Sequence, residues 1–298
     1  MSGHGDNKKP GSKIAGSGCE VLLPFHERKP LKEIAKSIIT TYRPAIWSRF
    51  MKAVRDYRLV DEGDKIAVAV SGGKDSTLMA KLFQELHLHG KVKFQLEFIA
   101  MDPGYHPSIR QLLTANCNYL EIPLHLFESR IFDIVDAVAR DYPCYMCAKM
   151  RRGALYAKAQ ELGCNKLALG HHYNDVIETT LLNLLYAGSF KTMLPKLKSL
   201  NFAGLELIRP LYYIEEETIT DFTKKNGLQP INCACTVAAH KTAGKRSEIK
   251  EIIRGLKKNS KGAEKSIFRA AHNVQLDCIV GWQEKGKKYS YLDFYEVE

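Results

Sequence analysis

A lysine, an aspartate and three hydroxyl side chains accompany two adjacent glycines at residues 71–77, which read "SGGKDST". Glycine lets the backbone approach an anion closely and adopt conformations that are closed to other residues. Lys74 adds a positive charge, and Asp75 is a ligand type that Mg²⁺ accepts beside phosphate oxygens. The segment therefore predicts a phosphate-binding loop. The candidate phosphate contacts are Ser71, Gly72, Gly73, Lys74, Asp75 and Ser76.

The residues on either side of this loop predict a strand before it and a helix after it. Residues 65–70 are mostly apolar and favour a strand, and helical spacing begins again over 75–88. The free N–H groups at the start of that helix would face the same anion. The lysine follows a Gly-Gly pair, so the loop differs from the Gly-x-x-x-x-Gly-Lys type.

Cysteines form a second candidate site. The chain has eight, and four of them stand in two close pairs, Cys144/Cys147 and Cys233/Cys235. Such pairs are typical of zinc, iron–sulfur or dithiol redox sites. Four thiolates would close a site, whereas three would leave one metal position open for chemistry. Three other cysteines stand singly among apolar residues, and we expect them to be buried core side chains: Cys117, Cys164 and Cys278.

Strand-like and helix-like segments alternate along most of the chain. The expected strands are 65–70, 93–101, 124–129, 166–170 and 205–211, and the expected helices are 75–88, 106–117, 130–140, 149–163, 173–187 and 215–226. Residues 31–58 have helical spacing interrupted near Pro44, and 244–273 are helical and basic. This alternation predicts an α/β fold with a parallel sheet, whose ligands bind beyond the carboxyl ends of the strands. That edge should hold 71–76, 101–102, Glu128 and 170–175.

Composition and length suggest one large domain with extensions. We expect a disordered tail over 1–20, a basic helical segment over 21–60, the nucleotide-binding domain with the cysteines over 61–240, and a basic extension over 241–298. Apolar content is 45%, and no run reaches the roughly 18–20 apolar residues of a membrane span. The polar first residues lack the apolar core of a secretory signal. We therefore expect a cytoplasmic protein without a membrane partner.

Positive charge is concentrated in two stretches. The formal net charge is +11, and residues 27–58 and 241–265 each hold nine lysines and arginines against three acidic residues. Clustered basic charge favours a polyanion such as a nucleic acid, although a solvated basic face would have the same composition. The candidate RNA contacts are Arg151, Arg152, Lys191, Lys196, Lys245 and Arg246.

The segment "GHHYND" follows an expected strand and opens an expected helix, so its side chains should reach the phosphate loop. Gly170 and His171 are expected to contact the nucleotide, and Asp175 to assist Mg²⁺. Asp102, at the end of the second expected strand, is a further candidate nucleotide contact. The residues expected to take part in catalysis are Lys74, Asp75 and Asp175.

The motifs resemble those of known enzymes. "SGGKDS" is similar to the PP-loop of the ATP pyrophosphatase superfamily, which cleaves ATP between the α and β phosphates. "CYMCAKMRRGALY", "KLALGHHYNDVIETTLLNLLYAG", "KTMLPKL" and "IRPLYYIEEETI" occur in the order seen in the tRNA 2-thiocytidine synthetases. The resemblance covers about residues 35–255 and implies ATP, Mg²⁺ and a four-iron cluster as cofactors. It implies tRNA as a partner, with a cysteine desulfurase or another sulfide source.

The resemblance implies thiolation of cytidine 32 of tRNA: ATP adenylates the C2 oxygen, and sulfur carried by a three-cysteine cluster replaces it. Cys144 and Cys147 would be two cluster ligands, and the third is either Cys233 or Cys235, because "NCACT" departs from the cysteine spacing of the family. An alternative is the same chemistry on another RNA base or a small molecule. Lysidine synthetases and two-thiouridine enzymes fit the cysteines less well. A nucleotide-sensing RNA-binding protein with a structural zinc is the non-enzymatic alternative, and a homodimer is compatible with the sequence.

Overall fold

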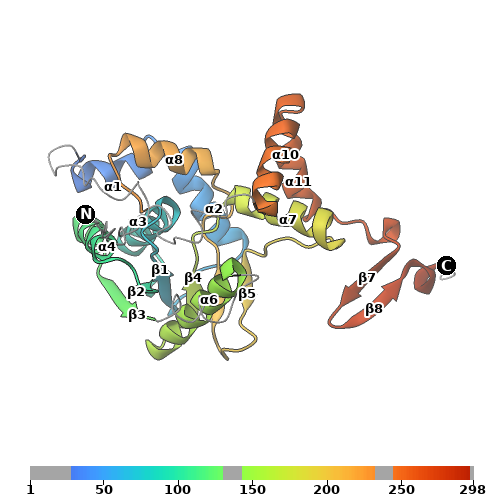
Figure 1. Ribbon diagram of the computed structural model, residues 1–298, viewed down its shortest axis with the longest axis horizontal. Coiled ribbons are helices and arrows are strands. Elements are labelled where there is room, and N and C mark those ends of the chain that lie inside the picture. Colours follow the sequence, from blue (N-terminus) through green and yellow to red (C-terminus); the bar gives the residue numbers. More distant parts are fainter. Residues whose placement is uncertain (1–27, 130–142, 232–243, 296–298) are drawn as a thin grey trace, which may run out of the picture. The chain divides into compact units, whose positions relative to one another are not determined.

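The computed structural model describes residues 28–129, 143–231 and 244–295, without the side chains of 143–149 (Figure 1). The chain forms two compact units. Unit 1 comprises residues 1–175 and 194–244, and unit 2 comprises residues 176–193 and 245–298. The helix expected over 130–140 lies outside the described residues.

The centre of unit 1 is a six-stranded sheet of order β3-β2-β1-β4-β6-β5 (Figure 1). All neighbouring strands are parallel except the pair β5–β6. The predicted α/β class with a parallel sheet is therefore confirmed. The strands are β1 (Lys65–Ala69), β2 (Gln95–Asp102), β3 (Leu124–Glu128), β4 (Lys166–Ala168), β5 (Lys196–Lys198) and β6 (Glu206–Ile208).

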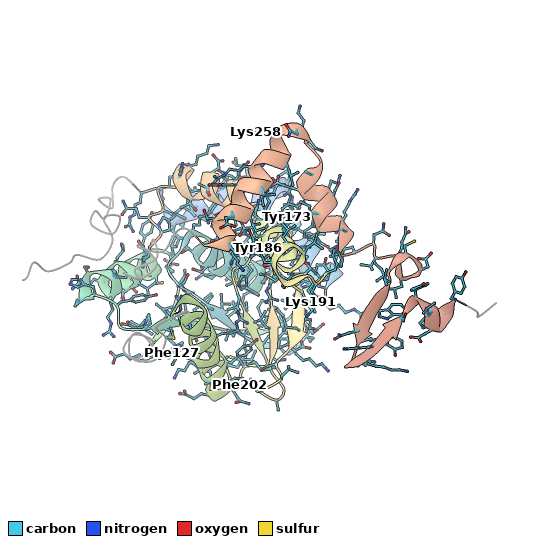
Figure 2. All side chains as sticks on the ribbon, turned by 45° about the vertical axis from the view of Figure 1, so that its right-hand side comes forward. Phe127, Tyr173, Tyr186, Lys191, Phe202 and Lys258 are labelled. Atoms are coloured by element: carbon cyan, nitrogen blue, oxygen red, sulfur yellow. The ribbon has the colours of Figure 1, made fainter. Side chains whose placement is uncertain are left out.

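The side chains of β1 are buried on both faces of the sheet, because helices cover both faces. Ala67 and Ala69 pack in a cluster with Tyr156 and Ala159 of α6, whereas Ile66 and Val68 alternate to the opposite face and are fully buried. Phe127 and Phe202 pack against the α6 side of the core (Figure 2). The helices of this α/β region are α3 (Lys74–His89), α4 (Pro107–Tyr119), α6 (Pro143–Glu161) and α8 (Glu216–Lys225). α7 (Tyr173–Ala187) begins in unit 1, and its residues from Val176 onward belong to unit 2.

The N-terminal helical region belongs to the same core. α1 (Leu31–Ile39) and α2 (Ser48–Asp56) are separated by a π-helical turn at Arg43–Trp47, which contains the proline where an interruption was predicted. Ile34, Ile38 and Phe50 are completely buried. Burial of this apolar stripe stabilises the helices far more than their intrinsic propensity does.

Strand order determines where a ligand can bind. The chain leaves β1 toward β2 and β3 on one side, and then returns to place β4 and β6 on the other side of β1. A crevice forms in such sheets at the carboxyl ends of the two strands where this direction reverses. Here those strands are β1 and β4, which are followed by the phosphate loop and by the segment "GHHYND".

Unit 2 contains most of α7 together with α10 (Lys245–Asn259), α11 (Ala263–Ala270) and the hairpin β7 (Gly281–Glu284) and β8 (Lys287–Ser290). Ile249 and Phe268 are buried in it. Glu178 is also buried, and its carboxylate accepts a hydrogen bond of 2.7 Å from Arg246 Nε. Among the described residues, none of the helices has the length and apolar composition required to cross a membrane.

Candidate nucleotide and sulfur-transfer site

The phosphate loop connects β1 to α3 and requires glycine at position 72. Gly72 has a φ of +80°, and a Cβ there would lie 2.6 Å from Cδ1 of Ile231. The Gly72 carbonyl also accepts a hydrogen bond of 2.9 Å from the N–H of Ile231. Any other residue would therefore be strained in its backbone and would force the Ile231 side chain to move.

Two serines hold the loop in shape. The buried hydroxyl of Ser76 accepts a hydrogen bond from the Ser71 N–H at 3.1 Å and donates to the Gly73 carbonyl at 3.0 Å. The two hydroxyl oxygens lie 3.0 Å apart. These contacts bend the backbone over the first turn of α3, where the N–H groups without helical partners attract an anion.

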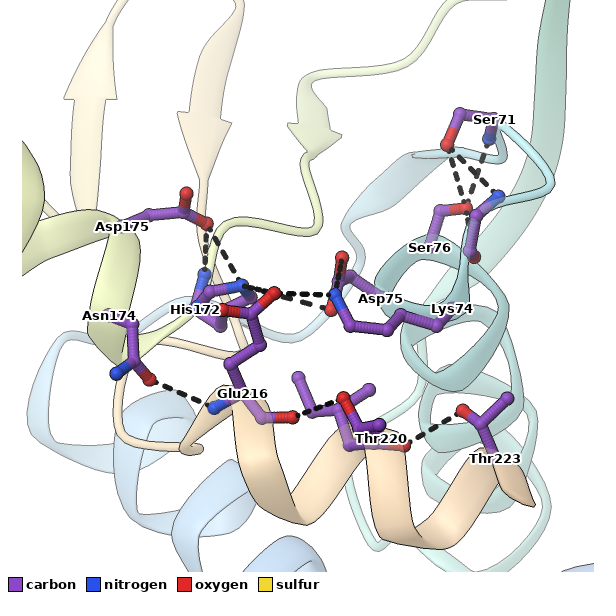
Figure 3. A network of polar contacts seen from close by, with 12 residues as sticks. Ser71, Lys74, Asp75, Ser76, His172, Asn174, Asp175, Glu216, Thr220 and Thr223 are labelled. Carbon is purple, nitrogen blue, oxygen red and sulfur yellow. Dashed lines mark hydrogen bonds and ion pairs between the residues drawn. The ribbon is translucent and has the colours of Figure 1, made fainter. Parts of the chain in front are cut away.

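Lys74 and Asp75 belong to a network of charged side chains from three elements (Figure 3). Lys74 Nζ donates to Asp75 Oδ2 at 3.1 Å and to Glu216 Oε1 at 2.9 Å. His172 Nε2 lies 3.5 Å from Asp175 Oδ2 and 3.9 Å from both Asp75 Oδ1 and Glu216 Oε1. The phosphate loop, the start of α7 and the start of α8 are thus connected through one lysine and one histidine.

The carboxylates decide the charge state of the lysine. Burial by itself would lower the pKa of the Lys74 ammonium, but the charge of Asp75 and the hydrogen bond to Glu216 outweigh burial and raise this pKa. Lys74 therefore remains a cation at neutral pH and is available to a phosphate group.

Backbone N–H groups bond to side chains at the starts of α7 and α8. The Glu216 N–H donates to Asn174 Oδ1 at 2.9 Å, and the His172 N–H donates to Asp175 Oδ2 at 3.0 Å. The second bond joins the residue before α7 to the third residue of the helix, as N-terminal capping contacts do. The start of α7 therefore orients the Asp175 carboxylate, and the bond to Asn174 holds the backbone of Glu216 at the start of α8.

A cavity of about 390 Å³ opens beside this network in unit 1. Its polar lining comes from the phosphate loop and from Arg151, Arg152, His171 and Asp175. Its apolar lining consists of Ala69, Val70, Met101, Leu155 and Leu169. Binding sites for small molecules commonly combine apolar walls with a few polar groups, and these walls fit the apolar faces of a nucleobase.

Gly170 lets two loops approach one another at this cavity. A Cβ at Gly170 would lie 3.2 Å from the backbone nitrogen of Ser76 and 3.3 Å from the carbonyl carbon of Asp75. Backbone atoms in the first turn of a helix cannot rotate away as a flexible side chain can. The short distance between the loop after β4 and the start of α3 therefore depends on the absence of a side chain.

Two residues of the site were missed by the sequence reasoning, although both lie in the segment "IRPLYYIEEETI". Glu216 pairs with Lys74. Arg209 is buried, and its Nε donates to His171 Nδ1 at 3.4 Å. Burial and the nearby charge of Arg152 lower the pKa of Arg209 to about 10. The only signals available were a charged residue within an expected apolar strand for Arg209 and an acidic residue at an expected helix start for Glu216.

Asp102 has its carboxylate occupied within the protein. It accepts hydrogen bonds from the N–H groups of Gly104 and Tyr105 at 2.9 and 2.6 Å and from Arg110 Nε at 2.7 Å. Asp102 is buried and is not part of the cavity lining. It therefore orders the loop after β2, which carries Tyr105 to the cavity, and a direct nucleotide contact by Asp102 stays a prediction.

The predicted RNA contacts are distributed over both units. Arg151 and Arg152 line the cavity of unit 1. Lys196, elsewhere in unit 1, pairs with Glu206 at 3.0 Å. In unit 2, Lys191 is exposed, and Lys245 Nζ lies 4.8 Å from the centre of the Tyr186 ring. Arg246 is engaged with Glu178 there. A contact of any of them with RNA stays a prediction.

The structure places the first cysteine pair within a helix. Cys144 and Cys147 lie in the first turns of α6, which begins at Pro143, so the expected helix start at 149 was wrong by six residues. Positions three apart share one helix face, and Arg151 lies one further turn along. Cys233 and Cys235 lie outside the described residues. No group of three metal-binding side chains occurs in the part of the chain that is described.

Two of the three single cysteines are buried as predicted, and one is not. Burial raises the pKa of the Cys117 thiol to about 12 and that of the Cys164 thiol to about 11, so both stay protonated. Cys278 is exposed, which corrects the prediction that it is a core residue. Its apolar neighbours Ile279 and Val280 are exposed as well, so this part of the chain offers no core in which to bury it.

Comparisons with known proteins identify the relatives of this chain. A family model for a PP-loop domain matches residues 44–232. The tRNA-cytidine(32) 2-sulfurtransferase of Geobacter metallireducens is 38% identical over 226 residues, which cover 75% of this chain and 87% of that protein. The enzyme of the same name from Pelobacter propionicus is 39% identical over 237 residues, which cover 79% and 87%.

Among solved structures, the fold resembles "U34-tRNA thiolase NcsA from Methanococcus maripaludis with its [4Fe-4S] cluster". The TM-score is 0.61 at 23% sequence identity, and the match covers 85% of this chain and 83% of that one. At this identity the similarity shows a shared fold.

Proposed function

This chain belongs to the PP-loop family of tRNA-cytidine(32) 2-sulfurtransferases, and we propose that it uses ATP to replace the C2 oxygen of a tRNA cytidine by sulfur. The observation that carries the proposal is the cavity between the phosphate loop and α6, which residues of the loop line together with Arg151 and Arg152, the arginines after the first cysteine pair. Adenylation turns the C2 oxygen into part of a leaving AMP, with release of pyrophosphate. A sulfide sulfur then forms the new bond to C2.

The phosphate loop would hold the phosphates of ATP. Free N–H groups at the start of α3 and the ammonium of Lys74 supply positive charge where negative charge develops on the departing pyrophosphate. The apolar walls of the cavity would receive the adenine ring. Lys74 already points toward the carboxylates of Asp75 and Glu216, so a phosphate group would exchange places with one of these partners.

A magnesium ion fits beside Asp75. The Asp75 Oδ1 atom is buried and accepts no hydrogen bond among the described residues. Mg²⁺ is commonly held by one or two carboxylates together with substrate phosphates and water. Asp75 and Asp175, which line the same cavity, are the two carboxylates that would hold it.

The first cysteine pair fits an iron–sulfur cluster in ligand type and placement. Cys144 and Cys147 share a face of α6 at the end that leads to Arg151 and Arg152. When bound, a cluster with three cysteine ligands supplies an open iron position for sulfide. We propose Cys233 or Cys235 as the third ligand. Arg151 and Arg152 would attract the RNA phosphates that accompany the target base.

The remaining parts of the proposal concern partners. tRNA is the substrate, and a cysteine desulfurase or another sulfide source supplies sulfur in the cytoplasm. A homodimer is the proposed assembly. Mass spectrometry of nucleosides from tRNA of cells that lack the protein distinguishes cytidine from another base, because only loss of 2-thiocytidine supports the proposed acceptor.

The phosphate-loop assignment is tested with Lys74→Ala and Asp75→Ala. We expect each to lower the rate of tRNA-dependent conversion of ATP to AMP by about 10²–10³, the usual effect of removing one group that stabilises a developing charge. Lys91→Ala, at an exposed site before β2, is the matched control and should keep the wild-type rate. Normal turnover in both loop variants would show that ATP is held elsewhere.

A further inference from the structure

The C-terminal hairpin segment, residues 275–295, lies beyond the residues that the family model matches. It contains β7 and β8, joined by the two-residue turn Lys285–Gly286 with φ angles of 50° and 84°. Positive φ at both positions defines a tight turn whose twist suits the two strands it connects. The segment is thus a regular element that the thiolation chemistry does not use.

Aromatic stacking holds the segment together. The Trp282 ring stacks on its cross-strand neighbour Tyr289 at 5.3 Å and on Phe294 at 5.3 Å between ring centres. After β8, the Ser290 N–H donates to Asp293 Oδ2 at 2.8 Å. This contact is part of a capping box that sets the direction of the chain. The aromatic side chains are therefore displayed in a defined arrangement.

Much apolar surface on this segment remains exposed. Val280 is 80% exposed, Leu292 62% and Tyr295 74%. Tyr291 is exposed too, and its ring meets that of Tyr295 edge to face, with 6.2 Å between ring centres. A hairpin of two strands is at best marginally stable in water, and contiguous exposed apolar surface commonly marks an interaction site. Another molecule is therefore expected to cover this face.

The lysines at the hairpin turn indicate what kind of molecule would cover this face, although the segment also holds the acidic residues Asp277, Glu284 and Asp293. Lys285, Lys287 and Lys288 cluster at the turn, and none forms an ion pair with any residue in the described ranges. Lys287 Nζ lies 5.0 Å from the centre of the Tyr289 ring. Protein–protein interfaces are depleted in lysine, whereas proteins that bind single-stranded nucleic acid combine basic charge with aromatic rings on which bases stack.

We propose that the C-terminal hairpin segment binds unpaired RNA, with Tyr291 and Tyr295 stacking on exposed bases and Lys287 and Lys288 contacting phosphates. The inference rests on the proposed function, because a tRNA substrate provides loops with unstacked bases. Recognition of RNA through its loops commonly uses aromatic side chains in this way. The segment supplies affinity for the substrate through residues other than those proposed to bind ATP.

The test measures binding of two RNA probes to the full chain by fluorescence anisotropy at several salt concentrations. One probe is a stem with an unpaired loop, and the other is a fully paired duplex of the same length. We expect Lys287→Glu/Lys288→Glu to weaken binding of the stem-loop at least tenfold. The slope of log affinity against log salt should become shallower by about 0.7–0.9 for each phosphate that the variant no longer neutralises.

Tyr291→Ala/Tyr295→Ala should weaken binding of the stem-loop at least fivefold, leave duplex binding unchanged, and keep the salt slope of the wild type. Neither tyrosine is part of the Trp282 stack, so unchanged Trp282 emission, measured with Trp47→Phe in both proteins, shows that the hairpin remains folded. Lys91→Glu/Lys93→Glu is the control for charge. Both lysines are exposed, the change in net charge is identical, and binding should not change.

The outcomes separate this proposal from the proposed function. If the wild type binds the stem-loop and both hairpin variants bind it equally well, the hairpin proposal is overturned while the proposed function stands. If the wild type binds neither these probes nor tRNA, both fail. If the tyrosine variant instead changes the sedimentation mass and not the affinity for RNA, the face belongs to a second copy of the chain, which also overturns the proposal.

Discussion

The hydrogen bond between Lys74 and Glu216 is expected to lock the phosphate loop to the start of α8. The two residues are 142 positions apart in the chain, and their side-chain atoms Nζ and Oε1 lie 2.9 Å apart. We expect Lys74→Met and Glu216→Gln each to destabilise unit 1, and the double variant to lose less than the sum. Removal of either partner ends the same interaction, so the two losses overlap.

The size of this coupling can be worked out from the structure. At 2.9 Å and an effective dielectric constant of about 20, the direct attraction is about 6 kcal/mol. The side chains of Lys74 and Glu216 are only 24% and 33% exposed, so loss of their hydration cancels much of this attraction. Hydrogen bonds to charged groups contribute about 1.5–3 kcal/mol net. We therefore expect a coupling energy of about 2 kcal/mol.

The assay is urea unfolding of the wild type, both single variants and the double variant, followed by far-UV circular dichroism. Glu215→Gln is the control, because the neighbouring Glu215 carboxylate pairs with Arg49 at 2.6 Å. Its effect should add to that of Lys74→Met within about 0.5 kcal/mol. A coupling between Lys74 and Glu216 as small as that of the control would refute the lock.

Two further predictions concern other contacts of unit 1. Gly170→Ala should weaken ATP binding about tenfold, because its Cβ would push the loop after β4 away from α3 by a few tenths of an ångström. Isothermal titration calorimetry measures this affinity. Gly153→Ala is the control and should bind ATP normally, because a Cβ at Gly153 meets no atom within 4 Å. Burial would raise the pKa of Asp102, but hydrogen bonds from backbone N–H groups and from Arg110 lower this pKa below its unfolded value. The ionised Asp102 carboxylate therefore stabilises the fold above the unfolded pKa of about 3.9, and this stabilisation is lost as the pH falls through the lower folded pKa. Asp102→Asn should therefore flatten the fall in unfolding free energy below about pH 4, and parallel pH profiles of the two proteins would contradict this reasoning.

The conformation of the loop over residues 71–76 was predictable from the sequence because it depends on neighbouring residues. A strand, two glycines and a helix start are contiguous in the chain, and the left-handed φ of Gly72 is a property of that residue type. The alternation of strands and helices likewise predicted the parallel sheet, since a buried parallel sheet requires apolar strands and crossover helices. The carboxyl-end position of "GHHYND" followed from the same rule.

Short or sparsely packed elements were beyond the sequence pattern. β5 has three residues, which is too few for an alternating pattern to show, and its antiparallel pairing with β6 appears only in the sheet. Cys278 has apolar neighbours like those of Cys164, yet it is exposed. Burial depends on whether another layer covers a segment, and neighbouring residue types do not record that layer.

The sequence by itself determined the candidate residues for the chemistry: the phosphate loop, the cysteine pairs and the basic charge. Only the tertiary structure decided which distant groups act on them. Glu216 reaches Lys74, Arg209 reaches His171, and the loop at Gly170 touches the start of α3. Each of these contacts depends on strand order and on how helices pack across the sheet. Many chain orders share the same local periodicity, so such contacts exist only once the sheet has assembled around β1 and β4.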